Sequence, residues 1–237
     1  MTDARMGGAP DGRGPGPGAF LRETLASLGD RRLLVPAALL TLLLTATNIV
    51  ILHNMPVRDA IPPAFLAAAL VRIAGLLCFA VAILRILGGS ARPPWRPDGA
   101  FWLYALTLVA GFVLKVALAR LLGGDDPVTG LVIGAAVLLI SAPFAAWFAA
   151  IAVERPLALA PGRWLRGMAG WLPALLLWSF LTVLPLGQLH AAIGLFLVEG
   201  GGELFWPLAL ADGPLSAVLA IFGLALAATA YRRVARG

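Results

Sequence analysis

The stretch 169-AGWLPALLLWSFLTVLPLGQLHAAIGLFLV-198 contains no charged residue and is the longest apolar run of the chain. As one α-helix it would be about 45 Å long, whereas the hydrocarbon core of a bilayer is about 30 Å thick. Pro185 lies near its middle, and proline bends or breaks a helix because it lacks a backbone N–H. The sequence therefore predicts a membrane span over about 167–184 and a second helix over 186–198, which lies along the outer surface or re-enters it.

The whole chain has the composition of a helical membrane protein. Of its 237 residues, 60% are apolar and only 13% are charged. The apolar residues gather into runs of about 20, the length that crosses a bilayer as a helix. We therefore expect an all-α, polytopic helix bundle in one membrane domain over 19–237, with six transmembrane helices at about 33–52, 64–87, 101–122, 128–153, 167–184 and 214–231.

The N-terminal region precedes the first span and divides into two parts. Residues 1–18 are rich in Gly and Pro and have almost nothing to bury, which predicts a disordered tail. Over 19–32, Leu21, Leu25 and Leu28 recur at helical spacing opposite polar residues. This pattern predicts a short amphipathic helix on the membrane surface.

The distribution of basic residues predicts the orientation. Of the 18 Lys and Arg residues, 14 lie on the side of the termini, Arg72 and Lys115 lie well inside predicted spans, and only Arg58 and Arg120, the latter near the end of a span, lie on the opposite side. Because positive residues concentrate on the cytoplasmic side, both termini are expected in the cytoplasm. The same rule, together with a composition typical of high-GC bacteria, predicts a multi-pass protein of the bacterial inner membrane. Since the charges flank apolar spans, the net charge of +6 indicates topology and not a nucleic-acid partner.

Arg72 and Lys115 are the ionisable residues predicted inside spans, both in the outer half of the membrane. Charged residues there are costly and often functional, so the pair is a candidate contact for an anionic lipid or solute, balanced by Glu199 or Glu203. The alternative is that both side chains extend outward to the headgroups. Every carboxylate is predicted to lie outside the spans, which argues against a proton-coupled pump.

Three further features suggest how helices meet or move. Thr41, Thr45 and Asn48 form a polar stripe on the first span that either lines a path or bonds another helix. Pro143 and Pro185 are candidate hinges.

Motifs for catalysis or cofactors are not found in the sequence. Cys78 is the only cysteine, and the two histidines, His53 and His190, have no metal-ligand spacing and are expected to be ordinary interfacial residues. We therefore expect no catalytic residues, no metal site and no cofactor.

Three stretches carry a resemblance to a known family. They are the amphipathic helix before the first span, 152-AVERPLALAPGRWLRGMAGW-171, and the closing 225-ALAATAYRRVARG-237. This layout resembles bacterial membrane proteins related to the membrane domain of glycerophosphodiester phosphodiesterases. The resemblance implies a six-helix bundle with a basic cytoplasmic turn and carries over no catalytic residues, since the metal-binding phosphodiesterase domain is absent from these residues.

Two functions are favoured at this point, and an intramembrane enzyme is a third alternative. The first is a non-enzymatic membrane component that contacts lipid or organises a membrane-protein partner, which includes a second copy of itself. The alternative is a small permease for an anionic or amphiphilic solute, in which the two prolines act as moving parts.

Overall fold

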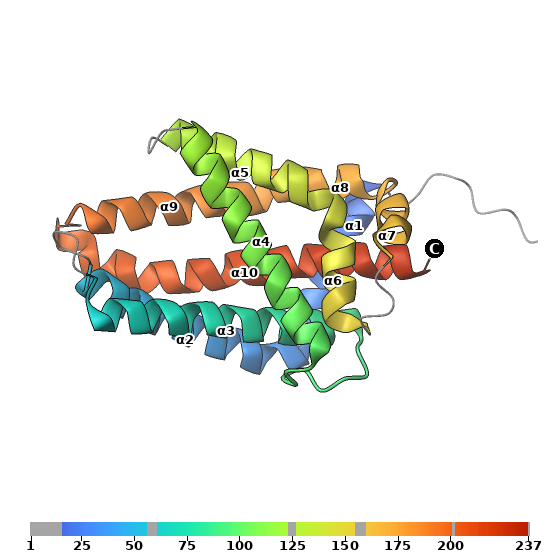
Figure 1. The fold of residues 1–237 in the computed structure, drawn as a ribbon, viewed down its shortest axis with the longest axis horizontal. Helices are drawn as coiled ribbons and strands as arrows, with labels where there is room; N and C mark the ends of the chain where they lie inside the picture. The colour runs from blue at the N-terminus through green and yellow to red at the C-terminus, as the bar shows by residue number, and fades with distance from the viewer. Residues whose placement is uncertain (1–15, 56–60, 123–126, 155–159, 201, 237) are drawn as a thin grey trace, which may run out of the picture.

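The computed structural model describes residues 16–55, 61–122, 127–154, 160–200 and 202–236, and within them all regular structure is helical. Figure 1 shows the helices packed side by side as an elongated bundle. In chain order the elements are α1 (Pro17–Leu28), η1 (Arg31–Leu33), α2 (Leu34–His53), α3 (Pro63–Gly88), α4 (Gly99–Leu122), α5 (Pro127–Ser141), η2 (Ala142–Phe144), α6 (Ala145–Val153), α7 (Pro161–Met168), α8 (Leu172–Trp178), the π-helical turn η4 (Ser179–Val183), α9 (Leu184–Val198), η5 (Gly202–Leu204) and α10 (Phe205–Arg236).

The all-α, six-span architecture predicted from the sequence is confirmed. Six helical segments of the described chain are long and apolar enough to cross a membrane: Arg31–His53, Pro63–Gly88, Gly99–Leu122, Val128–Val153, Leu172–Val198 and Gly202–Arg236. The amphipathic segment forms α1, which begins at Pro17, inside the region predicted as a tail. Residues 1–15, the rest of that predicted tail, lie outside the described residues.

The last helix, α10, is the centre of the bundle. It packs against α1, α2, α3, α6 and α9, and Figure 1 shows it running through the middle of the molecule. Its buried face is built largely from small residues, among them Ala209, Gly213, Ala217, Ala225 and Ala228. Small side chains let helix backbones approach closely, which is how helices associate where the surrounding lipid removes the hydrophobic driving force.

The predicted break at Pro185 is wrong. Residues Leu172–Val198 form one continuous helical segment, so the predicted surface helix over 186–198 is the second half of the fifth span. The π-helical turn η4 ends two residues before Pro185 and shifts the backbone hydrogen-bond register by one residue. This wider turn accommodates the missing N–H of the proline without a break. Residues 169–171 form a turn before the helix, and the remaining segment, about 40 Å long, fits a bilayer by tilting or by extending into the headgroup region.

The predicted kink at Pro143 is present. Pro143 lies in the 3-10 turn η2, which separates α5 from α6. Figure 1 shows α5 and α6 meeting there at a wide angle. A proline cannot donate the next helical hydrogen bond, so the span changes direction at this point.

The two described ends of the chain meet at one end of the bundle, which we call the α1 end (Figure 1). Glu23 of α1 accepts bonds there from Arg232 (3.2 Å) and Arg233 (2.5 Å) of α10. Phe20 and Thr24 of α1 are fully buried. These contacts dock α1 onto the bundle, and they hold both described ends of the chain at the α1 end.

A buried arginine fixes the loop between α3 and α4 at the α1 end. The side chain of Arg85 is fully buried, and its Nε donates to the carbonyl of Ala152 on α6 (3.1 Å). Its Nη1 donates to the carbonyls of Pro93 (3.1 Å) and Arg96 (2.7 Å), and its Nη2 bonds to Asp98 (2.5 Å). One side chain therefore ties α3, α6 and this loop together.

This arrangement stabilises the ionised form of Asp98. Burial pushes its pKa upward, but the backbone N–H of Phe101 and the guanidinium groups of Arg85 and Arg92 outweigh burial and hold the pKa below its usual value. A carboxyl whose pKa is lowered by folding stabilises the folded state above its unfolded pKa of about 3.9. That contribution is lost as the pH falls through the lower, folded value.

We therefore predict that Asp98→Asn destabilises the protein at pH 7 and that the difference from wild type shrinks as the pH falls below about 4. Subtracting the two unfolding free energies, measured in mixed micelles with SDS at pH 7 and at pH 3, cancels the titration of the other carboxyl groups. A difference that stays constant over this range would show that the ion pairs of Asp98 contribute nothing to stability.

Candidate functional site

A cluster of polar and ionisable side chains lies inside the membrane-spanning part of the bundle. Asp212 of α10 is almost fully buried, and its Oδ1 lies 2.6 Å from Nδ1 of His190 on α9. Its Oδ2 accepts a hydrogen bond from Nδ2 of Asn48 on α2 (3.0 Å). The Oδ1 of Asn48 in turn accepts from Arg72 on α3 (3.3 Å). The hydroxyl of Ser216, one turn after Asp212, lies 3.2 Å from the same nitrogen of His190. We call these five residues the polar cluster.

Four helices bring the polar cluster to one level. Counted at 1.5 Å per residue from the helix ends opposite the α1 end, the five residues lie at roughly 8–17 Å along their helices. They come from two helix pairs of opposite direction, α2 with α3 and α9 with α10, which pack against each other through α2 and α10. Residues far apart in sequence therefore meet in the half of the membrane away from the α1 end.

The sequence analysis missed Asp212, and its prediction that every carboxylate lies outside the spans is wrong. It starts the sixth span at Pro214, whereas α10 begins at Phe205 and continues through Pro214. Proline is tolerated in transmembrane helices, because neighbouring groups satisfy the freed backbone. The apolar residues on both sides of Asp212 could have signalled a longer helix. The carboxyl group is accommodated because Asn48 donates to its Oδ2 and His190 lies within hydrogen-bond distance of its Oδ1.

The polar cluster does not have the geometry of a Ser-His-Asp hydrolase. In such a triad the acid contacts one imidazole nitrogen, and the serine gives its proton to the other. Here Asp212 and Ser216 both lie against Nδ1 of His190. The cluster therefore lacks the relay of a triad, in which the acid and the serine contact different nitrogens of the imidazole.

An apolar cavity of about 630 Å³ lies between α3, α4, α5, α9 and α10. The polar side chains in its wall are those of Tyr104, Lys115 and Gln188. Along α4, the wall extends from Tyr104 to Ala119, which is about 22 Å of helix. The remaining lining residues are Leu40, Leu76, Ala80, Leu108, Gly130, Ile133, Gly134, Leu138, Val183, Leu184, Gly187, Ala191, Leu219, Ala220, Gly223 and Leu224. We call this space the lipid cavity, because its wall lies within membrane-spanning helices.

A smaller cavity of about 200 Å³ continues the lipid cavity toward the α1 end. The two share Tyr104, Leu138, Val183, Gly223 and Leu224 in their walls. The smaller space also reaches Ser141 and Ser179. Together they form an elongated, mainly apolar space with a cationic side chain, Lys115, in the half away from the α1 end.

The structure does not bring Arg72 and Lys115 together in one site, although the sequence analysis predicts this. Arg72 contacts the polar cluster, whereas Lys115 lines the lipid cavity. The carboxyl group whose charge acts on the guanidinium of Arg72 is that of Asp212. Glu199 and Glu203 form no ion pair with Arg72 or Lys115 within the described chain, and they lie at the C-terminal end of α9 and in η5. The two cations therefore belong to two different environments.

The predicted polar stripe lies at the contact between α2 and α10. The hydroxyls of Thr41 and Thr45 bond to carbonyls of their own helix, at Ala37 (2.9 Å) and Thr41 (2.8 Å). Asn48 reaches across to α10. The structure thus favours helix-to-helix contact for this stripe over a lined path.

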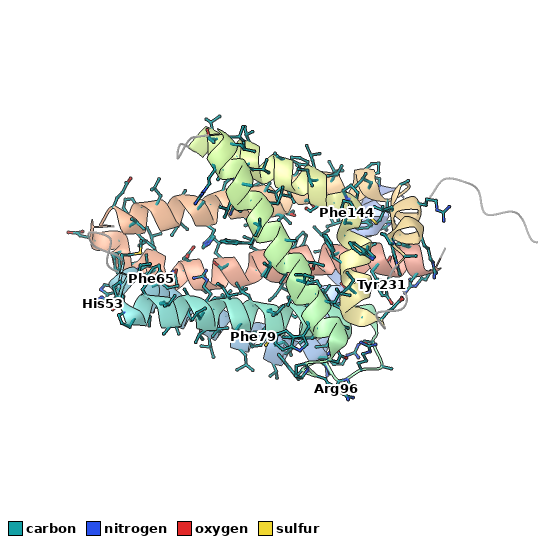
Figure 2. All side chains as sticks on the ribbon, in the orientation of Figure 1. His53, Phe65, Phe79, Arg96, Phe144 and Tyr231 are labelled. Carbon is teal, nitrogen blue, oxygen red and sulfur yellow. The ribbon has the colours of Figure 1, made fainter. Side chains whose placement is uncertain are left out.

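The two histidines have different surroundings. Figure 2 shows His53 at the far end of α2, the interfacial place that the sequence predicts. His190 was expected at the interface as well, but its span continues to Val198, and it lies within the membrane. Among the described residues, no group of three His, Cys, Asp or Glu side chains is placed to hold a metal ion.

Comparisons of the chain with known protein families, with curated proteins and with solved structures find no significant match, so the resemblance to the membrane domain of glycerophosphodiester phosphodiesterases stays a prediction.

Proposed function

We propose that this protein is a non-enzymatic membrane component that binds an anionic membrane lipid, with an acyl chain in the lipid cavity and the headgroup near Lys115. The observation that carries the proposal is an apolar space of about 630 Å³ with one cationic side chain in its wall. Apolar concave sites with a few polar groups are the usual form of small-molecule sites. Inside a bilayer the molecules that reach such a space are lipids.

Two features of the lipid cavity support an acyl chain as its occupant. Its wall follows about 22 Å of α4, a length comparable with one to one and a half leaflets of the hydrocarbon core. Gly187 and Gly223 leave room in the wall, because an added Cβ at either position would meet no atom within 4 Å. Lys115 adds the charge that would select an anionic headgroup over a neutral one.

The orientation and location are part of this proposal. The α1 end, with the arginines that bind Glu23, is placed in the cytoplasm by the positive-inside rule, in a bacterial inner membrane. Lys115 would then face the outer leaflet. A membrane-protein partner or a second copy of the chain would pack against the lipid-exposed faces of the helices.

A permease for an anionic or amphiphilic solute is the second candidate. It is favoured by the polar cluster, because ionisable residues inside transmembrane segments mark substrate and ion pathways in many transporters. In that case α9, which contributes to both the polar cluster and the lipid cavity, is the element that would move.

The proposal predicts which substitutions release bound lipid. Lys115→Gln should lower retention of anionic lipid about fivefold, since a cation near a headgroup contributes about 1 kcal/mol. Gly223→Leu should abolish it, because position 223 lines both cavities and has open space where the leucine would enter. Native mass spectrometry from gentle detergent, after reconstitution with phosphatidylglycerol, measures retention directly.

Two matched controls separate lipid binding from general damage. Arg120→Gln removes a cation from the same helix outside the cavity, and Gly111→Leu adds the same side chain to α4 where no atom lies within 4 Å. Equal lipid retention by Gly223→Leu and Gly111→Leu would overturn the proposal. Transport of labelled phosphatidylglycerol across liposomes by the wild type, lost in Gly223→Leu, would favour the permease.

A further inference from the structure

We propose that His190 is a proton-binding site inside the membrane and that Asp212 holds it ready to take up that proton. The inference does not depend on the lipid cavity. It rests on the short contact between Nδ1 of His190 and Oδ1 of Asp212 (2.6 Å), on the burial of Asp212, and on the charges around them.

The first step is the tautomer of the imidazole. An ionised carboxylate only accepts hydrogen bonds, so the proton between Asp212 and His190 belongs to Nδ1. In the neutral ring, Nε2 then carries a lone pair and no proton. Asp212 also accepts from Asn48, so both of its oxygens are bonded by donors. The carboxylate thereby fixes which nitrogen is open to a proton.

The second step is access. The side chain of Asp212 is only 2% exposed, whereas that of His190 is 33% exposed. Nδ1 faces Asp212 and Ser216. The imidazole, and not the carboxylate, is therefore the group of this pair that an incoming proton meets first. In the step itself an Nε2–H bond forms and the donor, a hydronium ion, is left as water, while Nδ1–H stays with Asp212.

The third step is charge. The described elements packed most extensively against α9 are α5, η4 and α10, and among them α10 brings a charged group, Asp212, against the imidazole. Arg72 acts through Asn48, and Lys115 lies in the wall of the lipid cavity. With His190 neutral, Arg72 and Asp212 balance each other. One added proton leaves two cations for one carboxylate, and the imidazolium is the closer of the two.

The consequence is competition for Asp212. Arg72 reaches the carboxylate only through Asn48, by bonds of 3.3 and 3.0 Å. An imidazolium in direct contact at 2.6 Å takes over the charge of Asp212. Arg72 is then the excess cation, and its long side chain can extend toward the membrane surface. Proton uptake by His190 on α9 therefore changes the position of Arg72 on α3.

The test uses the fact that the chain has only two histidines. In a His53→Gln background, His190 is the sole histidine, and ¹⁵N-histidine labelling reports it alone. Solid-state NMR of the protein in liposomes, between pH 8.5 and 4.5, separates the Nδ1–H tautomer, the Nε2–H tautomer and the imidazolium. We expect the Nδ1–H tautomer at high pH and conversion to the imidazolium on acidification.

Two variants sharpen the test. Asp212→Asn should leave His190 neutral at a pH where the wild type holds the imidazolium, because the balancing charge is gone. Ser216→Ala should behave as wild type, since it changes no charge and leaves the contact between Asp212 and His190. An Nε2–H tautomer at high pH, the absence of imidazolium down to pH 4.5, or identical spectra for Asp212→Asn and wild type would each overturn the proposal. Should Asp212→Asn fail to fold, the first two outcomes still decide it.

Discussion

Replacing Arg85 with alanine is expected to lower the free energy of unfolding by about 3–5 kcal/mol, the usual cost of removing one partner of a buried ion pair. The substitution leaves Asp98 without its closest cation. It also removes the donor for three carbonyl groups, those of Pro93, Arg96 and Ala152. Of these three residues Ala152 is buried, and a buried acceptor that loses its donor pays the cost of desolvation with no compensating bond.

The measurement is SDS-induced unfolding in mixed micelles, with two companion variants. Arg96→Ala removes an exposed arginine from the same loop and should change stability by about 0.5 kcal/mol or less. Figure 2 shows Arg96 at the edge of the molecule. Arg85→Lys keeps the charge, but its single ammonium group cannot make all the hydrogen bonds of the planar guanidinium. Its loss of unfolding free energy should therefore fall between those of Arg85→Ala and Arg96→Ala. Equal stability of Arg85→Ala and Arg96→Ala would contradict the anchoring role.

Gly213→Ala is the second substitution with a large expected effect, about 3 kcal/mol or more, because it overpacks the contact between α2 and α10. A Cβ at 213 would overlap Oγ1 of Thr45 and lie 2.6 Å from the Cα of the same residue. A side-chain rotation cannot relieve a clash with a backbone atom. The two helices must therefore separate, and the hydrogen bond between Asn48 and Asp212 is next to that contact.

The matched control for this substitution is Gly194→Ala in α9. No atom lies within 4 Å of a Cβ at that position, so the alanine meets only open space. Since alanine is the better helix former, this variant should keep or raise stability, by up to about 1 kcal/mol. Thermal unfolding of both variants in the same detergent gives the comparison. A Gly213→Ala protein as stable as Gly194→Ala would show that α2 and α10 do not pack as closely as described.

The lipid cavity and the polar cluster both include residues of α9, so lipid binding and proton binding can be tested for coupling. Gln188 and Ala191 face the lipid cavity, and His190 belongs to the polar cluster. Lipid retention that changes between pH 8.5 and pH 5 in wild type but not in His190→Gln would connect them. Retention independent of pH would leave two separate sites on one helix.

Several properties follow from the sequence alone, because they depend on local composition. Long apolar runs set the number of spans, since each must satisfy its backbone within a helix of bilayer length. The spacing of Leu21, Leu25 and Leu28 predicts the amphipathic helix that the structure shows as α1. Pro143 predicts the kink between α5 and α6. The charge asymmetry predicts that both termini are cytoplasmic, and this stays a prediction.

Only the tertiary structure decided which polar residues meet. Pro185 and Pro214 signal breaks in a sequence, but a π-helical turn and the packing of α10 carry the helices through both. Asp212 is read as a loop residue until His190 and Asn48, 22 and 164 positions away, are seen to satisfy its carboxylate. The energy of a buried charge depends on partners that packing brings from other helices, and no local pattern in the chain records them.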